Sequence, residues 1–306
     1  DGLIRWRRQY WLFCSASKRN ETFVERLQNL GDGGVVTNYT FQNCDFMDLE
    51  RLPDGITAIF SSAFEGCTNL ALTSLPKGIT SIASYTFRGC SALALTSLPE
   101  GLVRINKCAF EHCERISLKR LPEGLTLIAP STFTGCDALA LTSLPDGIVA
   151  IGGYAFTGCT ALALTSLPEK LDWIGYKAFY GCKNMALTSL PDEIVTIGSY
   201  AFTDCFNLAL KSLPDGITNI SMGTFSGCRA LALTSLPKEI TRIGPHAFQD
   251  CRSLALTSLP EKLSWIGYEA FVNCSALKLT SLPKELELFP YNIDERAFEG
   301  CPLVSF

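Results

Sequence analysis

The chain lacks long apolar runs, a marked excess of either charge and most of the side chains that catalyse reactions. Among its 306 residues, no apolar stretch approaches the roughly 18 residues that a membrane-spanning helix needs. Charged residues make up only 18%, and the formal net charge of −4 gives no electrostatic reason to expect nucleic acid as a partner. Hydrophobic residues make up 47%, which excludes disorder for most of the chain.

Cysteine, in contrast, is abundant, and its spacing is regular. Of the 14 cysteines, eleven follow one another at intervals of 23 residues. They are Cys44, Cys67, Cys90, Cys113, Cys136, Cys159, Cys182, Cys205, Cys228, Cys251 and Cys274. Cys301 follows after 27 residues, and only Cys14 and Cys108 lie outside the series. A fixed period of roughly 20–50 residues is the signature of a solenoid, in which each unit buries its apolar side by stacking on its neighbours.

Each period carries apolar residues at fixed positions. The unit reads C-x-x-L-x-L-x-x-L-P-x-x-I-x-x-I-x-x-x-A-F-x-x-C, as in the block from Cys136 to Cys159. The L-A-L-T-S-L segment is short and apolar, which predicts a parallel strand stacked at about 4.8 Å on the next coil, and proline then ends that strand. A second extended stretch follows, for example Ile148 to Ile151, and the A-F-x-x-C piece is compatible with a short helical turn.

These residues resemble the leucine-rich repeats, and specifically the BspA-like class with 23-residue units. That class is recognised by an I-G-x-x-A-F-x-x-C core, which stands here at 151–159 and 197–205. The resemblance implies a repeat solenoid, an arc of about 12 coils with a parallel β-sheet on one side and short strands or helical turns on the other. The family commonly reads C-x-x-L-x-x-I-x-I-P, so it stays open which of Leu141, Thr142 and Leu144 points inward.

The N-terminal segment differs from the repeats. Residues 1–30 carry six basic and three acidic residues, whereas the remainder carries 20 basic and 27 acidic residues. Thr22 and Glu25 form a capping-box pattern ahead of a helix face that ends at Gly31. Because a solenoid needs a cap over its exposed end, we predict an N-terminal helical cap over residues 1–34.

The repeat array is predicted over residues 35–306, with an irregular last coil over 275–306. Before the array, residues 4–13 mix basic and aromatic side chains densely. Two interpretations stay open for this stretch. Its aromatic side chains cover the first coil, or it contacts an acidic partner or an anionic membrane surface. Any membrane contact of this protein is predicted only through residues 4–13.

Side chains for catalysis or metal binding are nearly missing. His112 adjoins Cys113, a pairing found in nucleophilic sites, but Cys113 belongs to the inward series and its neighbour should point away. No G-x-S-x-G, Gly-rich phosphate loop or H-E-x-x-H motif is present. Zinc sites use closely spaced cysteine pairs, and only Cys108 and Cys113 lie within six residues of each other. We predict a protein with no enzymatic activity, cofactor or metal.

The regularly spaced cysteines are predicted to be reduced and buried, acting as small hydrophobic residues. Identical coils do not specify pairs of thiols, so a disulfide framework is not expected. Cys108 stands where other coils carry tyrosine, and we expect it to be partly exposed. Reduced thiols favour an intracellular or organellar compartment, although the sequence leaves a surface or secreted location open.

The outward positions of the L-A-L-T-S-L segment are nearly uniform. Ala, Thr and Ser recur there, which is typical of a solvated sheet face. A remote alternative is a hydroxyl lattice that binds ice. Lys119 and Arg120 interrupt the uniform pattern, and they are therefore candidates for contact with a partner.

Two aromatic pairs lie four periods apart, Trp173 with Tyr176 and Trp265 with Tyr268. Each tryptophan precedes an inward isoleucine, so strand alternation is expected to turn it outward. Exposed Trp and Tyr are the usual anchors of interfaces. The alternative is that duplication copied one coil together with its aromatic residues. The candidate partner-binding residues are Trp173, Tyr176, Trp265, Tyr268, Lys119 and Arg120.

The absence of catalytic motifs and the extended surface together favour a non-enzymatic scaffold or adaptor that docks another protein or a protein assembly. The resemblance implies a second hypothesis, a cell-surface or secreted adhesin, because BspA-like members include surface proteins implicated in adhesion. A third hypothesis is a structural subunit whose repeats hold a large assembly together.

Overall fold

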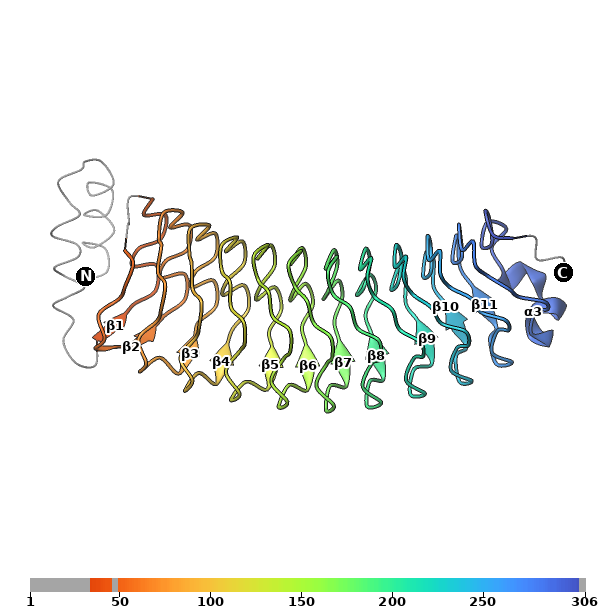
Figure 1. Ribbon diagram of the computed structural model, residues 1–306, viewed down its shortest axis with the longest axis horizontal. Coiled ribbons are helices and arrows are strands. Elements are labelled where there is room, and N and C mark those ends of the chain that lie inside the picture. The colour runs from red at the N-terminus through yellow and green to blue at the C-terminus, as the bar shows by residue number, and fades with distance from the viewer. Residues whose placement is uncertain (1–33, 46–48, 303–306) are drawn as a thin grey trace, which may run out of the picture.

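The computed structural model describes residues 34–45 and 49–302. They wind into a bowed array of stacked coils with one short strand in each (Figure 1). The strands are β1 (Gly34–Val36), β2 (Ile56–Ile59), β3 (Ser81–Ile82), β4 (Arg104–Ile105), β5 (Leu127–Ile128), β6 (Ala150–Ile151), β7 (Trp173–Ile174), β8 (Thr196–Ile197), β9 (Asn219–Ile220), β10 (Arg242–Ile243) and β11 (Trp265–Ile266). The repeat solenoid predicted from the cysteine period is thus confirmed.

Within each sheet, neighbouring strands pair in parallel, and from β2 onward they pair in register. Trp173 lies opposite Ala150 on one side and Thr196 on the other. The strands form three sheets, β1–β4, β5–β8 and β9–β11. From β3 onward each strand ends on a buried isoleucine, and the residue before it is exposed or half-buried. The position where Trp173 stands therefore faces outward in every coil.

The predicted location of the strand was wrong. The structure places it in the I-x-x-I stretch, not in L-A-L-T-S-L. In the latter segment the Ala163 N–H donates to the Leu141 carbonyl at 3.1 Å, but the chain then bends toward the proline turn, and isolated bonds do not build the evenly spaced ladder of a parallel sheet. Leu141 and Leu144 are buried while Thr142 is exposed, which answers the question of orientation that the family pattern leaves open.

Phenylalanine forms a column through the core. Rings from neighbouring coils stack with centroids 5.1–5.7 Å apart, from Phe41 to Phe298. The A-F-x-x-C segment that carries them forms consecutive turns instead of the predicted helical turn. Its backbone N–H groups bond to the next coil instead of within a helix. For example, the Phe156 N–H donates to the Ala178 carbonyl at 2.8 Å.

The regularly spaced cysteines form a second column, and from Cys67 onward each of these thiols donates a hydrogen bond. Cys159 Sγ donates to the Phe133 carbonyl at 3.0 Å. The same bond, 2.9–3.1 Å long, recurs for the regular series from Cys67 to Cys274 and for Cys301. The thirteen cysteines within the described residues are free, and Cys108 is half-buried as predicted. Cysteine is therefore a hydrogen-bond donor in this core as well as a small hydrophobic residue.

The last coil departs from the repeat. It contains the short helix α3 (Lys284–Leu288) and the 3-10 turn η1 (Pro290–Asn292), after which Ile293 bridges to Ile266 of β11. No helix in the described ranges is long and apolar enough to cross a membrane. The predicted N-terminal helical cap and the basic aromatic stretch over residues 4–13 lie outside the described residues.

Candidate protein-binding surface

Each coil presents three exposed positions in order along the chain: the turn after Leu-Pro, the strand, and the residues just after the strand. We call these positions together the strand-side surface. Trp173 lies on its strand position with 39% of its surface exposed, and Tyr176 follows three residues later with 40% exposed. Both rings are therefore available to solvent on the same coil.

Tyr176 belongs to an aromatic cluster. Its ring makes edge contacts with Tyr154 of the preceding coil, at 5.1 Å between centroids, and with Tyr200 of the following coil, at 6.0 Å. The Lys177 ammonium lies 5.2–5.9 Å from the ring centroids of Tyr154, Tyr176, Tyr180 and Tyr200. We call these four rings and Lys177 the tyrosine cluster. Cation–π attraction of this kind holds a cation at the centre of the aromatic group.

The backbone that presents the cluster is left-handed at Tyr154, Lys177 and Tyr200, with φ of 60°, 53° and 58°. Residues at the equivalent position share this conformation from Ser62 to Glu269, so it belongs to the fold and not to a single site. A hydrogen bond with Tyr176 raises the pKa of the Lys177 ammonium. Lys177 therefore remains protonated among the rings near neutral pH.

The second aromatic pair is already engaged within the array. Trp265 is half-buried, and the Arg242 guanidinium lies 4.6 Å from its ring centroid. The Tyr268 hydroxyl accepts a hydrogen bond from Arg296 of the last coil. The two pairs look alike in sequence but differ in the structure. Arginine side chains contact both Trp265 and Tyr268, whereas no such arginine contact is formed by Trp173 or Tyr176 among the described residues.

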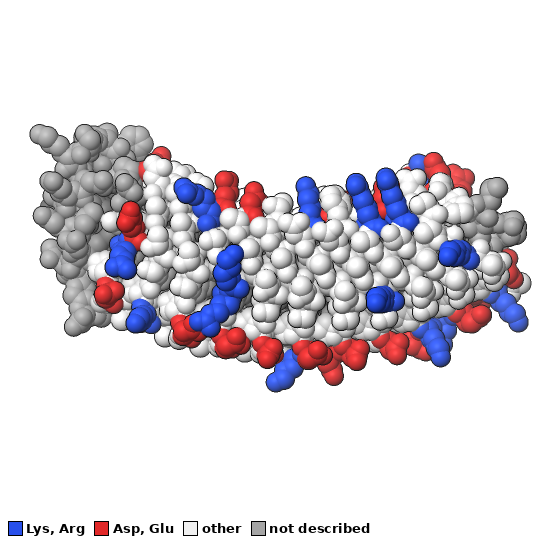
Figure 2. Space-filling model, viewed as in Figure 1, with Lys and Arg blue, Asp and Glu red and all other residues white. Residues whose placement is uncertain are grey.

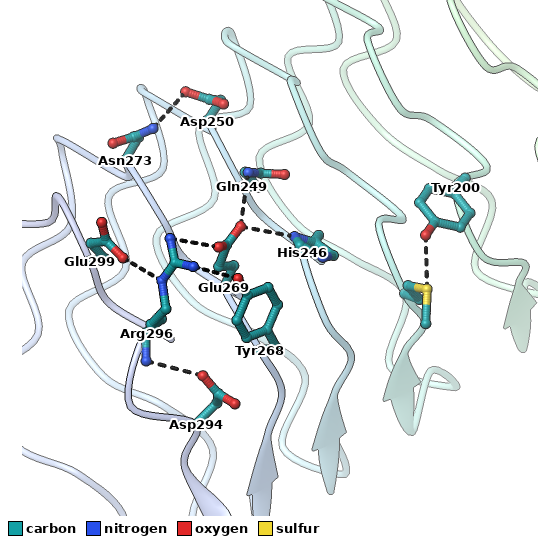
Figure 3. A network of polar contacts seen from close by, with 11 residues as sticks. Tyr200, His246, Gln249, Asp250, Tyr268, Glu269, Asn273, Asp294, Arg296 and Glu299 are labelled. Atoms are coloured by element: carbon teal, nitrogen blue, oxygen red, sulfur yellow. Dashed lines mark hydrogen bonds and ion pairs between the residues drawn. The ribbon is translucent and has the colours of Figure 1, made fainter.

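Arg296 is the centre of a polar network that joins the last coils (Figure 3). Its guanidinium lies 2.9 Å from the carboxylate of Glu269, a residue with only 9% of its surface exposed. His246 Nδ1 and Gln249 Nε2 each lie 3.4 Å from the same carboxylate. Because the partners come from three consecutive coils, the network fastens the C-terminal end of the array.

Lys119 and Arg120 are exposed on the L-A-L-T-S-L segment, across the proline turn from the strands. Arg120 pairs with Glu100 at 2.5 Å. The broad face turned to the viewer in Figure 2 carries few charged side chains. These two predicted residues are thus not brought together with the aromatic pairs.

The candidate catalytic pair is separated as predicted. Cys113 is fully buried, its thiol donates to the Phe87 carbonyl at 3.0 Å, and burial raises its pKa. His112 is exposed at a left-handed position that several other coils fill with glycine. Within residues 34–45 and 49–302, no group of three or more His, Cys, Asp or Glu side chains is placed to hold a metal ion.

Parallel coils with one strand each, a leucine-lined interior and exposed outer positions define a leucine-rich repeat solenoid. Such proteins are generally non-enzymatic, and they generally bind other proteins. The family model described as the BspA type leucine-rich repeat region matches residues 34–163, 126–255 and 196–306. The chain therefore belongs to the BspA-type leucine-rich repeat family.

Solved structures share this fold. A leucine-rich repeat protein from Bacteroides ovatus is 24% identical, with a TM-score of 0.56 over 88% of this chain and 87% of that one. A leucine-rich repeat protein from Eubacterium ventriosum is 20% identical, with a TM-score of 0.53 over 90% of both chains. The pneumococcal vaccine antigen PcpA is 13% identical, with a TM-score of 0.50 over 84% and 79%. Comparison with curated proteins found no match.

Proposed function

We propose that the array is a non-enzymatic scaffold or adaptor that docks another protein on its strand-side surface, around Trp173 and the tyrosine cluster. The observation that supports this proposal is the exposure of Tyr154, Trp173 and Tyr176 on two neighbouring coils, where the rings of Tyr154 and Tyr176 are in contact. Large rings with polar tips lose little conformational entropy on binding and dominate interface energies. The uniform Ala, Thr and Ser positions elsewhere offer no comparable anchor.

Site-specific photo-crosslinking tests the location of the docking surface. A benzophenone amino acid replaces Tyr176 in one variant and Thr142, an exposed residue of the L-A-L-T-S-L segment, in the control. In extracts of the native source, position 176 should crosslink a defined partner that position 142 does not. Equal yields of the same partner at both positions, or no crosslink at position 176, would contradict the proposal.

The two aromatic pairs supply a matched substitution test. Trp173→Ser should weaken capture of the crosslinked partner, whereas Trp265→Ser should weaken it less because Arg242 already covers that ring. Loss of an interface anchor costs about 2 kcal/mol or more of binding free energy, a change of roughly thirtyfold in affinity. If both variants and the parent chain capture the partner equally well, Trp173 does not contribute to the docking surface.

A surface adhesin is the second candidate, favoured by the fold shared with the pneumococcal vaccine antigen PcpA. The free cysteines favour a reducing compartment instead. Labelling intact cells of the source with a membrane-impermeant biotin reagent separates the two candidates. Biotin on this chain would support the adhesin, and its confinement to the cell interior would support the adaptor.

A further inference from the structure

We infer that the strand-side surface of coils β4–β8 binds a cationic amphipathic α-helix that lies along the axis of the array. The inference rests on the proposed function and names the chemistry of its partner. An exposed apolar stripe on coils β4–β8 and a parallel acidic row on coils β4–β9 support it.

The apolar stripe consists of one large exposed side chain per coil. Its members alternate between the residue before the strand and the first strand residue, and 39–59% of the surface of each is exposed. They are Val103, Leu127, Val149, Trp173 and Val195. The equivalent residues of the flanking coils are polar, Thr80 and Ser81 before the stripe and Thr218 and Asn219 after it. The stripe therefore has a defined length of five coils.

An acidic row follows the stripe in the turns after Leu-Pro. Over the turns from coil β4 to coil β9 it contains seven carboxylates and one lysine, Lys170. The carboxylates belong to Glu100, Glu123, Asp146, Glu169, Asp192, Glu193 and Asp215, all exposed. Lysines begin the turn on both sides of this range, at Lys77 and Lys238. Acidic side chains accordingly follow the lower edge of the array in Figure 2.

Most of the acidic row is without an ion-pair partner. In the part of the chain that the structure describes, Glu100 pairs with Arg120, and no salt bridge joins the other six carboxylates to a lysine or arginine. Glu169, Asp192 and Glu193 also line a shallow open hollow, together with Lys170 and Asp172. A row of unpaired carboxylates beside an apolar stripe is complementary to lysine or arginine that flanks apolar side chains.

The spacing of the coils favours a helix as the occupant. Paired strands lie about 4.8 Å apart, and the phenylalanine rings inside the same coils lie 5.4–5.6 Å apart. One helical turn advances 5.4 Å, so a helix along the axis places one apolar side chain on each coil. An extended peptide repeats its side chains on one face every 6.6 Å or so. This repeat is longer than the coil spacing, so its side chains no longer coincide with the coils after two or three of them.

Binding of a designed peptide tests the inference. The probe is a fluorescein-labelled, alanine-rich helix of about 15 residues, roughly 22 Å long, with leucine once per turn and lysine beside it. Two control peptides carry glutamate in place of lysine, or the same residues in an order that disperses the leucines. Anisotropy titrations should show binding of the lysine probe, at least tenfold weaker binding of the dispersed peptide, and none of the glutamate peptide.

Two double variants with the same change in net charge provide the matched control. Glu123→Lys with Asp146→Lys reverses charge in the acidic row, whereas Glu114→Lys with Asp137→Lys reverses it in the same coils at the turn after each cysteine. The first should weaken binding of the lysine probe about tenfold or more, and the second should change it less than threefold, because close charge pairs outweigh the screened net charge. Circular dichroism checks that both variants fold.

Three results would overturn the inference: equal weakening by both double variants, equal binding of the dispersed peptide, or no binding of the lysine probe at 100 µM or so, where even a weak specific contact would be visible. Each of them leaves the crosslinking test at position 176 unaffected. If that crosslink forms while the probe does not bind, the scaffold proposal stands and only the identity of the partner as a cationic helix fails.

Discussion

Raising the pH should unfold the array steeply, because its buried thiols can ionise only when the coils open. Desolvation raises the pKa of the Cys67 thiol to about 12. It also raises the pKa of eight further thiols, from Cys90 to Cys251, well above the ordinary value. In the unfolded chain the same thiols ionise near pH 8.5. A group whose pKa is raised by folding stabilises the folded state below its unfolded pKa, and that stability is lost as the pH rises toward the folded value.

The size of the effect follows from the number of thiols. Each of the nine thiols lowers the free energy of unfolding by about 1.4 kcal/mol per pH unit above pH 8.5. Between pH 7.5 and pH 9.5 the free energy of unfolding should therefore fall by about 12 kcal/mol, which is comparable with the whole stability of an ordinary domain.

Urea unfolding followed by tryptophan fluorescence, in the presence of a reductant at pH 7.5, 8.5 and 9.5, measures this slope. The triple variant Cys136→Ser, Cys159→Ser, Cys182→Ser should keep one donor per coil while lowering the slope by a third, since three of nine thiols no longer titrate. A fall of less than about 4 kcal/mol between pH 7.5 and 9.5, or a slope that the triple variant leaves unchanged, would refute the reasoning.

Two further pairs of substitutions test the packing between coils, with urea unfolding as the measurement. A Cβ at Gly175 would lie 2.5 Å from the Gly153 nitrogen, whereas one at Gly101 meets nothing within 4 Å, so Gly175→Ala should cost about 1–3 kcal/mol and Gly101→Ala should cost nothing. Phe156 is fully buried and stacked on both sides, so Phe156→Ala should cost about 3–5 kcal/mol, while the exposed Phe289→Ala should cost less than 1. Equal effects within either pair would contradict these packing assignments.

Much of the coil can be predicted from the sequence alone, because its constraints repeat. Ile174, Phe179 and Cys182 recur every 23 residues in step with their equivalents, and a residue that recurs at the same place in every unit must face the shared interior. The burial of Phe179 and Cys182 follows from the same argument as the outward direction of Trp173, which stands immediately before the inward Ile174. Free thiols at the regular positions follow as well, because identical coils provide no pairing rule.

Only the tertiary structure determined the position of the strand and the contacts between outward side chains, because both depend on hydrogen bonds and packing between neighbouring coils. Both the L-A-L and the I-x-x-I stretches are extended and apolar, and only the pairing of the coils selects Ile174 and its equivalents for the strand. The tyrosine cluster is assembled from Tyr154, Tyr176, Tyr180 and Tyr200, which fall at three different positions of the repeat. Aligning the units therefore does not reveal that these rings gather around one lysine. Likewise, Trp173 and Trp265 have almost identical sequence surroundings, and the exposure of one differs from that of the other because Arg242 of the preceding coil stacks on Trp265. Periodicity determines which residues face the core, whereas the contacts between outward side chains depend on the few residues in which one coil differs from the next.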